Sequence, residues 1–304
     1  MNHDRTKVVY LAGPMRGYAQ WNFPAFDLNR DYLVEHGFTV ISPADLDRNV
    51  GFDSLDSSSV FTESDFQDAM RRDYAALLRC DSIAFLNGWE KSRGANLERQ
   101  FAEKLGLIKY RVDAESDYLE REVIVGVAGV ARSGKDTLAN RLVARLGFER
   151  RAFADTLRNV LYATNPIVET ASAGPRRVQE IVDDIGWDDA KVRYSEIREL
   201  LQRLGTEGGR VHIAEDVWNR AIFEKPHGPR LVIPDVRFPN EADAIHARGG
   251  IVVRVTRDGY EPINGHVSET AYSDQDFIVE NNGNIEDLYY TFLQGWHTME
   301  ELAL

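Results

Sequence analysis

The 304-residue chain has a single cysteine and no long hydrophobic run. Because one cysteine cannot form an internal disulfide, Cys80 is expected to be buried filler rather than a bridge partner or a nucleophile. No apolar run approaches the roughly 20 residues that a transmembrane helix needs. The charged N-terminus passes directly into a short strand-like run, which is not typical of a signal peptide. We therefore expect a cytoplasmic protein with no membrane partner.

The chain also lacks an excess of basic residues, since its formal net charge is -13. Proteins that bind duplex DNA normally present a basic face, so polymeric nucleic acid is not an expected partner. An acidic total still leaves room for local basic pockets that bind small phosphorylated substrates. A composition of 43% hydrophobic and 28% charged residues is typical of a globular protein, and the length is sufficient for two domains.

Short apolar runs alternate with helical patterns in the first part of the chain. The expected strands and helices are 7–14, 23–37, 38–45, 66–80, 81–89 and 94–106. Such alternation predicts a parallel sheet covered by helices. The Ser- and Asp-rich stretch 46–65 is expected to be a long loop. The charge-dense stretch 111–122 has no apolar strand pattern, and we place the domain boundary there.

The stretch VIVGVAGVARSGKDTLANRL, residues 123–142, combines an apolar strand, a glycine-rich turn and the start of a helix. Gly129 to Lys135 fit the pattern G-x-x-x-x-G-K of a phosphate-binding loop (P-loop). Its glycines let backbone N–H groups turn toward phosphate oxygens, and Lys135 can reach the β- and γ-phosphates. The predicted ATP-binding residues are Gly129, Arg132, Ser133, Gly134, Lys135, Asp136 and Thr137.

Two carboxylates are candidate magnesium ligands. Asp136 occupies the position where Ser or Thr usually follows the lysine. It can hold Mg²⁺ directly or through water, or cap the helix, and the hydroxyl role can pass to Thr137. Asp235 ends the apolar run 229–236 and can hold Mg²⁺ or orient the acceptor phosphate, while Arg237 can grip a phosphate with two parallel hydrogen bonds. The alternative for this pair is a salt bridge at the end of a strand.

Residues 123–295 resemble the deoxynucleoside monophosphate kinases of tailed bacteriophages almost throughout. The resemblance rests on ARSGKDT (131–137), FADTLRNVL (153–161), LQRLGTEGGR (201–210), DVW (216–218), PDVRFPNEADAIHARGG (234–250), VVRVTR (252–257) and HVSET (266–270). It implies a P-loop kinase with a parallel sheet, which transfers the γ-phosphoryl group of ATP to a deoxynucleoside 5'-monophosphate with Mg²⁺. Lys135 and Asp235 are the candidate catalytic residues. The candidate substrate-binding residues of this part are Arg158, Arg210, Arg237, Arg254, His266 and Glu269.

The first part of the chain has a second group of candidates. Ser92 lies just before an expected helix that begins at Gly94, and Glu98 lies one turn inside it. A serine there can offer its hydroxyl and backbone N–H to an anion, and the glutamate can face a sugar. The alternative is that Ser92 only caps the helix and Glu98 is an exposed acid beside Arg99.

Residues 7–110 resemble the nucleoside 2-deoxyribosyltransferase superfamily, through YLAGPMRG, NFPAF, CD and GWEKSRGANLE. The superfamily includes 2'-deoxynucleoside 5'-monophosphate N-glycosidases, whose Ser-x-Gly-x-x-x-Glu spacing is matched by Ser92, Gly94 and Glu98. The resemblance implies that Glu98 is the nucleophile or stabilising carboxylate at C1'. The other implied site residues are Tyr10, which orients Glu98, Asp73 as a base or sugar ligand, Gly13 in the turn after the first strand, and Arg16, which binds the 5'-phosphate with Ser92. Trp89 either stacks on the base or is packed.

Together these patterns predict a two-domain α/β protein. Residues 1–112 form a flavodoxin-like, deoxyribosyltransferase-type domain, and residues 122–304 form a P-loop deoxynucleoside monophosphate kinase. Both would bind small deoxynucleotides, and we expect a homo-oligomer that acts in phage nucleotide metabolism. In one alternative the first domain is a non-catalytic nucleotide-binding or oligomerisation module. In another the protein is a nucleotide sensor, if Asp136 does not support magnesium.

Overall fold

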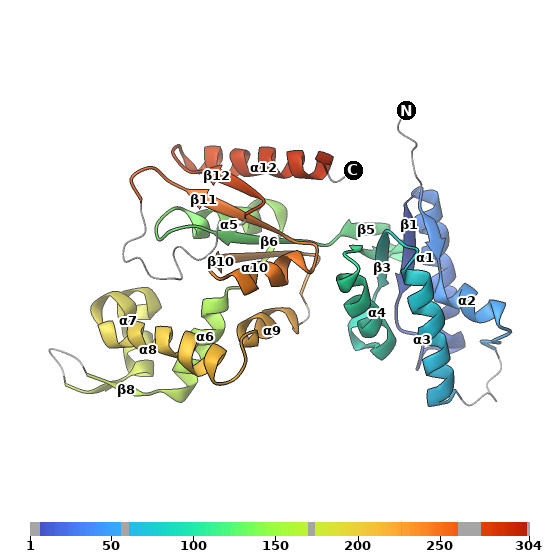
Figure 1. Ribbon diagram of the computed structural model, residues 1–304, viewed down its shortest axis with the longest axis horizontal. Coiled ribbons are helices and arrows are strands. Elements are labelled where there is room, and N and C mark those ends of the chain that lie inside the picture. The colour runs from blue at the N-terminus through green and yellow to red at the C-terminus, as the bar shows by residue number, and fades with distance from the viewer. Residues whose placement is uncertain (1–6, 56–60, 170–173, 226, 261–274, 303–304) are drawn as a thin grey trace. The chain divides into compact units, whose positions relative to one another are not determined.

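The computed structural model describes residues 7–55, 61–169, 174–225, 227–260 and 275–302. They form two compact units, each of α/β type (Figure 1). The first unit is the chain up to Ile124 with Gly228–Arg230 and His246–Gly250, and the second is the remainder. Within the described ranges, no helix combines the length and apolarity that a bilayer crossing requires. The predicted fold class, a two-domain α/β protein with parallel sheets, is confirmed.

The first unit is built on a five-stranded sheet with the order β2-β1-β3-β4-β5. The strands are β1 (Val8–Ala12), β2 (Thr39–Ile41), β3 (Ser82–Leu86), β4 (Ile108–Asp113) and β5 (Tyr118–Arg121). The first four pair in parallel, and β5 is antiparallel to β4. This order is that of flavodoxin-like doubly wound sheets.

Helices cover both faces of this sheet (Figure 1). They are α1 (Phe23–Glu35), α2 (Pro43–Asn49), α3 (Glu63–Leu77) and α4 (Arg93–Lys104). Successive side chains of a strand point to opposite faces. Accordingly, Val9 and Leu11 pack in the buried cluster that contains residues of α1, whereas Tyr10 and Ala12 pack in the cluster that contains residues of α3 and α4. Because both faces are covered, β1 and β3 consist mainly of apolar residues.

Two stretches of the first unit differ from the sequence-based expectation. The expected loop 46–65 contains the end of α2 and the start of α3, and its residues 56–60 lie outside the described ranges. The charge-dense stretch 111–122 contains β5, so the sheet continues beyond residue 112, where we expected the first domain to end. A strand with so many charges is stable here because several of those charges are paired.

Glu122 is the centre of that pairing. Its side chain is only 1% exposed and lies 3.0 Å from Arg99 and 2.6 Å from Arg111. Burial by itself raises the pKa of Glu122, but the two guanidinium groups outweigh it and lower the pKa to about 2. The same two guanidinium groups lie 4.9 and 4.8 Å from the centre of the Trp89 ring. Trp89 is 6% exposed and packs against these two cations, which favours the packed alternative.

The second unit is built on a sheet with the order β12-β11-β6-β10-β7. The strands are β6 (Val123–Ala128), β7 (Glu149–Arg150), β10 (Arg230–Val236), β11 (Ile251–Thr256) and β12 (Phe277–Glu280). The pairs β7·β10, β6·β11 and β11·β12 are parallel. The apolar run 229–236 thus contains β10, and the strand before the P-loop lies inside the sheet as β6.

Helices flank this sheet, and the helices between residues 153 and 223 form a separate layer, drawn below the sheet in Figure 1. The helices are α5 (Lys135–Leu146), α6 (Phe153–Thr164), α7 (Val178–Arg193), α8 (Ser195–Arg203), a π-helix (Leu204–Val211), α9 (Val217–Phe223), α10 (Pro239–His246) and α12 (Ile285–Leu302). A short hairpin joins β8 (Ile167–Val168) to β9 (Arg176–Arg177). A buried cluster that includes Leu161, Ile181 and Ile197 holds α6, α7 and α8 together.

The ion-paired Glu122 gives the first testable prediction. Replacing Glu122 by Gln leaves two buried arginines without their shared counter-charge, so we expect the free energy of unfolding of the first unit to fall by about 3 kcal/mol near neutral pH. Because the folded-state pKa is lowered, the wild-type contribution is present above about pH 4.5 and is lost as the pH falls toward 2. The difference between Glu122→Gln and wild type in chemical denaturation should therefore shrink over that range. The exposed Glu115, changed to Gln, is the control, and equal stability of the two variants would contradict the prediction.

Candidate functional site

In a doubly wound sheet, ligands bind at the carboxyl ends of the strands, where the strand order reverses. In the first unit this point lies between β1 and β3. Gly13 follows β1, and a Cβ atom on it would lie 3.0 Å from the Cβ of Leu86, so a larger residue would not fit without a shift. Ser92 accepts a hydrogen bond from the Ala95 amide (3.3 Å) and donates to the Gly13 carbonyl (3.4 Å). Ser92 thus caps α4 and, at the same time, joins the two expected phosphate-binding segments.

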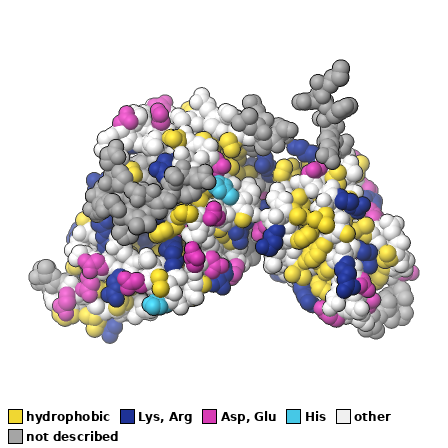
Figure 2. All heavy atoms as spheres, viewed as in Figure 1, with side chains coloured by type: hydrophobic (Ala, Val, Ile, Leu, Met, Phe, Trp, Pro, Cys, Tyr) yellow, Lys and Arg dark blue, Asp and Glu magenta, His cyan; other side chains and the backbone are white. Residues whose placement is uncertain are grey.

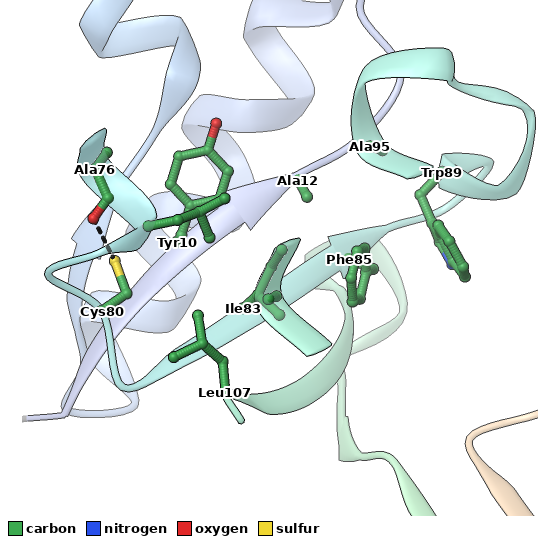
Figure 3. Close-up of a cluster of buried hydrophobic side chains, with 11 residues drawn as sticks. Tyr10, Ala12, Ala76, Cys80, Ile83, Phe85, Trp89, Ala95 and Leu107 are labelled. Carbon is green, nitrogen blue, oxygen red and sulfur yellow. Dashed lines mark hydrogen bonds between the residues drawn. The ribbon is translucent and has the colours of Figure 1, made fainter. Parts of the chain in front are cut away.

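The candidate catalytic residues of this unit come together beside that point. The Tyr10 hydroxyl donates to Oε1 of Glu98 at 2.7 Å. Tyr10 is fully buried, Glu98 is 5% exposed and Asp73 is 8% exposed. Figure 3 shows the hydroxyl of Tyr10 pointing away from the apolar side chains around it. Glu98 is therefore not the exposed helix acid that the sequence also allowed.

Burial dominates the electrostatics of these acids. It raises the pKa of Asp73 to about 7, and it raises the pKa of Glu98 well above its ordinary value, with the charge of Asp73 adding to the effect. The hydrogen bond from Tyr10 works in the opposite direction on both. Two neighbouring carboxyl groups in such surroundings do not both ionise easily. Burial and the proximity of the two carboxyl groups therefore disfavour the ionised form of both.

The remaining predicted residues of the first unit are more dispersed. The Arg16 guanidinium lies over the rings of Phe61 and Phe66, 4.5 and 4.8 Å from their centres, and no described hydrogen bond joins it to Ser92. A Cβ atom on Gly94 would make only ordinary contacts, the closest at 3.9 Å, so packing alone does not require glycine there. Cys80 is buried and donates its thiol hydrogen to the Ala76 carbonyl, which confirms its structural role (Figure 3).

The sequence did not reveal a strained turn that follows Gly13. Gln20, Trp21 and Asn22 all have positive φ angles, of 52°, 53° and 61°. Such angles are costly for residues other than glycine and persist only where surrounding contacts impose them. Here the Trp21 ring packs against Phe52 at 5.3 Å and Phe61 at 5.1 Å between centres. No short-range pattern predicts this aromatic group, because its members come from separate segments.

The P-loop has the predicted geometry. Gly129 and Gly134 have φ angles of 141° and 110°, which side chains rarely tolerate. A Cβ atom on Gly129 would collide with the Val255 carbonyl, and one on Gly134 would collide with the side-chain amide of Asn281. Lys135 donates its ammonium to the Val130 carbonyl at 2.6 Å, so it is held over the loop. The remaining predicted members of the loop are buried Ser133, exposed Arg132 and half-buried Thr137.

Asp136 points outward, with 73% of its side chain exposed, and forms an ion pair with Arg150 at 2.9 Å. No side-chain hydrogen bond caps α5, so the capping role considered for Asp136 is not observed. Arg150 also pairs with Asp155 at 3.4 Å. Neither Arg150 nor Asp155 was a predicted site residue, although Asp155 lies inside the segment FADTLRNVL that begins α6 and Arg150 lies three residues before it.

Asp235 at the end of β10 holds the start of α6. Its two carboxylate oxygens accept the amides of Phe153 and Ala154, at 3.0 and 2.8 Å. Burial raises the pKa of Asp235, and these two hydrogen bonds partly offset the rise. Among the described residues Asp235 has no ion pair, so the salt bridge considered as an alternative is not observed. Arg237 is exposed nearby.

Arg210 lies at the end of the π-helix and pairs with Glu241 at 2.5 Å. Glu241 is 2% exposed and also accepts the amides of Arg237 (2.7 Å) and Phe238 (3.1 Å). Burial raises the pKa of Glu241 to about 7. Glu241 therefore fixes Arg210 to the turn that carries Arg237. The sequence could have indicated Glu241 because it lies in the segment PDVRFPNE, six residues after Asp235.

The other predicted cations lie on separate elements. Arg158 pairs with Asp155 at 3.2 Å and with Asp188 at 3.8 Å. Arg254 stands beside Ala128 in the β11·β6 pairing, just before the P-loop, and its buried Nε has no hydrogen-bond partner. His266 and Glu269 lie outside the described residues.

A pocket of about 480 Å³ lies next to the P-loop helix. It is lined by Thr137, Arg257, Asn281, Gly283, Asn284, Ile285 and Glu286. These residues come from the start of α5, the ends of β11 and β12, and the start of α12. Only Thr137 was predicted, because the other residues follow no recognisable motif.

Comparison with known proteins agrees with this division. Residues 7–110 match a domain of unknown function (DUF4406), and residues 176–292 match the family model of deoxynucleotide monophosphate kinase. A "Putative deoxynucleotide monophosphate kinase" of Acanthamoeba polyphaga mimivirus is 30% identical over 184 residues, which cover 55% of this chain and 92% of that protein. A "Deoxynucleotide monophosphate kinase" of Escherichia phage RB69 is 26% identical over 106 residues, 31% of this chain and 41% of that protein. With the family model matched over residues 176–292 and a relative of 30% identity matched over 92% of its length, the chain belongs to the deoxynucleotide monophosphate kinase family.

Proposed function

We propose that the second unit transfers the γ-phosphoryl group of ATP to deoxynucleoside 5'-monophosphates. The observation that carries the proposal is the loop between β6 and α5, where two glycines with positive φ bring backbone N–H groups and Lys135 together in a member of this family. Phosphoryl transfer needs positioned positive charge and in-line geometry more than a covalent nucleophile. The P-loop meets this need for the donor, and the 480 Å³ pocket beside Thr137 is the proposed place of the donor nucleoside.

The acceptor phosphate is proposed to lie near the end of β10. Asp235 orders the start of α6, and Glu241 orders Arg210 and the backbone of Arg237. These ties hold the Arg210 guanidinium and the backbone that carries Arg237, and phosphate binding favours cations on such ordered elements. Arg158 and Arg254 are further proposed phosphate contacts, on α6 and β11.

Magnesium would supply charge neutralisation between the donor phosphates when bound. Magnesium commonly binds proteins through one or two carboxylates together with substrate phosphates and water. Within the described ranges, no three His, Cys, Asp or Glu side chains converge as a metal site. Exposed Asp136, one residue beyond Lys135, fits such a role, whereas both oxygens of Asp235 already accept amides. We propose Asp136 as the magnesium ligand and Asp235 as an ordering residue.

We further propose that the first unit cleaves the N-glycosidic bond of a deoxynucleoside 5'-monophosphate. The Tyr10–Glu98 hydrogen bond beside Asp73, at the point where the strand order reverses, favours this activity over simple binding. As the bond breaks, its electron pair leaves with the base, and C1' becomes cation-like. The Glu98 carboxylate stabilises or captures C1', water then adds there, and a proton passes to the base. Ser92 and the start of α4 would hold the 5'-phosphate.

The proposed substrates are small deoxynucleotides. On the face drawn in Figure 2, Lys and Arg side chains are interspersed with Asp and Glu, and this face has no broad basic surface of the kind that polymeric nucleic acid needs. A chromatographic assay of each dNMP with and without ATP tests both activities, since ADP formation reports the kinase and free base without ATP reports the glycosidase. If no base is released, the first unit is a binding or oligomerisation module. The expected homo-oligomer and cytoplasmic location stay predictions.

Lys135→Ala is predicted to abolish dNMP-dependent ATP turnover. The lysine supplies charge to the β- and γ-phosphates, and removal of such a preorganised group costs on the order of 10²-fold or more. ADP formation should fall by that factor while the far-UV circular dichroism stays unchanged. The exposed Lys104 of α4, changed to Ala, is the control and should keep full turnover. Near-normal turnover in Lys135→Ala would rule out the P-loop assignment.

Asp136→Asn is predicted to raise the magnesium concentration needed for half-maximal turnover more than it raises KM for the dNMP. The change removes a charged oxygen beside the donor phosphates and also breaks the pair with Arg150. Arg150→Gln breaks the same pair but leaves the carboxylate, so it is the matched control and should not raise the magnesium requirement. If both variants give the same magnesium titration, Asp136 acts only through Arg150.

Glu98→Gln is predicted to abolish base release and to leave kinase turnover unchanged. The amide keeps the size of the side chain but cannot provide negative charge at C1'. Base release from canonical and 5-substituted dNMPs is measured by chromatography. Glu103→Gln, on the same helix, is the control because Glu103 pairs with Arg99 and not with Tyr10. Base release by Glu98→Gln at the wild-type rate would show that Glu98 is not the reacting carboxylate.

A further inference from the structure

Asn281 connects the P-loop to a distant part of the kinase unit. It follows β12, and its backbone amide donates to the Thr256 carbonyl at 2.8 Å, which places it at the carboxyl edge of the sheet. Its side-chain amide donates to the Ser133 carbonyl, inside the P-loop, at 2.7 Å. The two residues are 148 positions apart in the sequence, so no local motif contains both.

The packing around this hydrogen bond is tight. A Cβ atom on Gly134 would collide with the Asn281 side chain, and Gly134 has a φ of 110°. Glycine at this position therefore serves two purposes, since it provides the backbone conformation of the loop and also the space that the Asn281 amide occupies. A larger residue at 134 would displace Asn281 even if its backbone could adopt the angle.

The orientation of the Ser133–Gly134 peptide follows from this contact. In a planar trans peptide the C=O and N–H bonds point in opposite directions, and the described chain has no cis peptide. Because Asn281 holds the Ser133 carbonyl on its own side, the Gly134 amide points to the other side. P-loops bind phosphate through such amides, and a peptide held in one orientation need not reorganise when the ligand arrives.

We propose that Asn281 is a positioning residue of the kinase site, which holds the Ser133–Gly134 peptide in its phosphate-binding orientation and forms one wall of the donor pocket. The inference rests on the phosphoryl transfer proposed above. It gives a residue outside the P-loop a role in binding the donor ATP, since Asn281 also lines the 480 Å³ pocket beside Thr137. Binding of the acceptor dNMP would not depend on it.

The test compares Asn281→Ala with Asn282→Ala. Asn282 is the matched control because it is the adjacent residue of the same type, and its side chain accepts the backbone amide of Asp258, at 2.9 Å, which is not part of the P-loop. Loss of one ordering hydrogen bond is expected to raise KM for ATP about 3- to 10-fold in Asn281→Ala. KM for the dNMP should stay within about twofold of wild type, and the melting temperature should match that of the control.

Asn281→Asp is the second variant and carries the test if Asn281→Ala does not fold. It keeps the shape of the side chain but replaces the amide donor by a carboxylate that repels both the Ser133 carbonyl and the donor phosphates. It should therefore raise KM for ATP more than Asn281→Ala does. The inference would be overturned if KM for ATP were unchanged in Asn281→Ala and in Asn281→Asp. It would also be overturned if KM for ATP and KM for the dNMP rose equally and the melting temperature fell. If the wild type turns over no dNMP, the kinase proposal fails, and equilibrium titration with ATP alone decides the role of Asn281.

Discussion

Parallel pairing of strands is the constraint on which the rest of both units depends. Parallel neighbours cannot be joined by a tight turn, so each connection crosses the sheet and usually contains a helix. The helices then bury both faces of the sheet, and the carboxyl ends of the strands meet along one edge. In the first unit Gly13 and the segment that leads to Ser92 leave from that edge, and in the second unit the P-loop and Asn281 leave from it.

The buried acids of the first unit have pKa values that are shifted in opposite directions. Glu122 lies between two guanidinium groups, so its pKa is low and its charge stabilises the fold. Among the described residues neither Asp73 nor Glu98 forms an ion pair, and burial raises the pKa of each. Unpaired buried acids cost stability, and they are common where a protein needs a reactive carboxyl group. This contrast within one small sheet separates a structural acid from two candidate reactive ones.

In the second unit, several candidate phosphate-binding segments are tied to residues from other elements. Asp235 binds the start of α6, Glu241 binds Arg210, and Asn281 binds the Ser133 carbonyl. These ties consist of carboxylate or amide side chains that bond backbone groups or a guanidinium. In the phosphoryl transfer proposed above, such ties would reduce the reorganisation that binding of the phosphates requires. The cations themselves are spread over several helices and strands.

The sequence by itself determined the features that depend on neighbours within a few residues. The strand, glycine turn and helix around Lys135, the alternation of strands and helices, and the serine cap before Glu98 are all of this kind. Only the tertiary structure decided the contacts between distant segments, such as Tyr10 with Glu98 and Asn281 with Ser133, 88 and 148 positions apart. It also decided that the charge-dense stretch 111–122 contains a strand, because Glu122 is stable in the interior only when Arg99 and Arg111 are folded around it. Local patterns fix backbone conformation, whereas burial and charge pairing depend on which segments the folded sheet brings together.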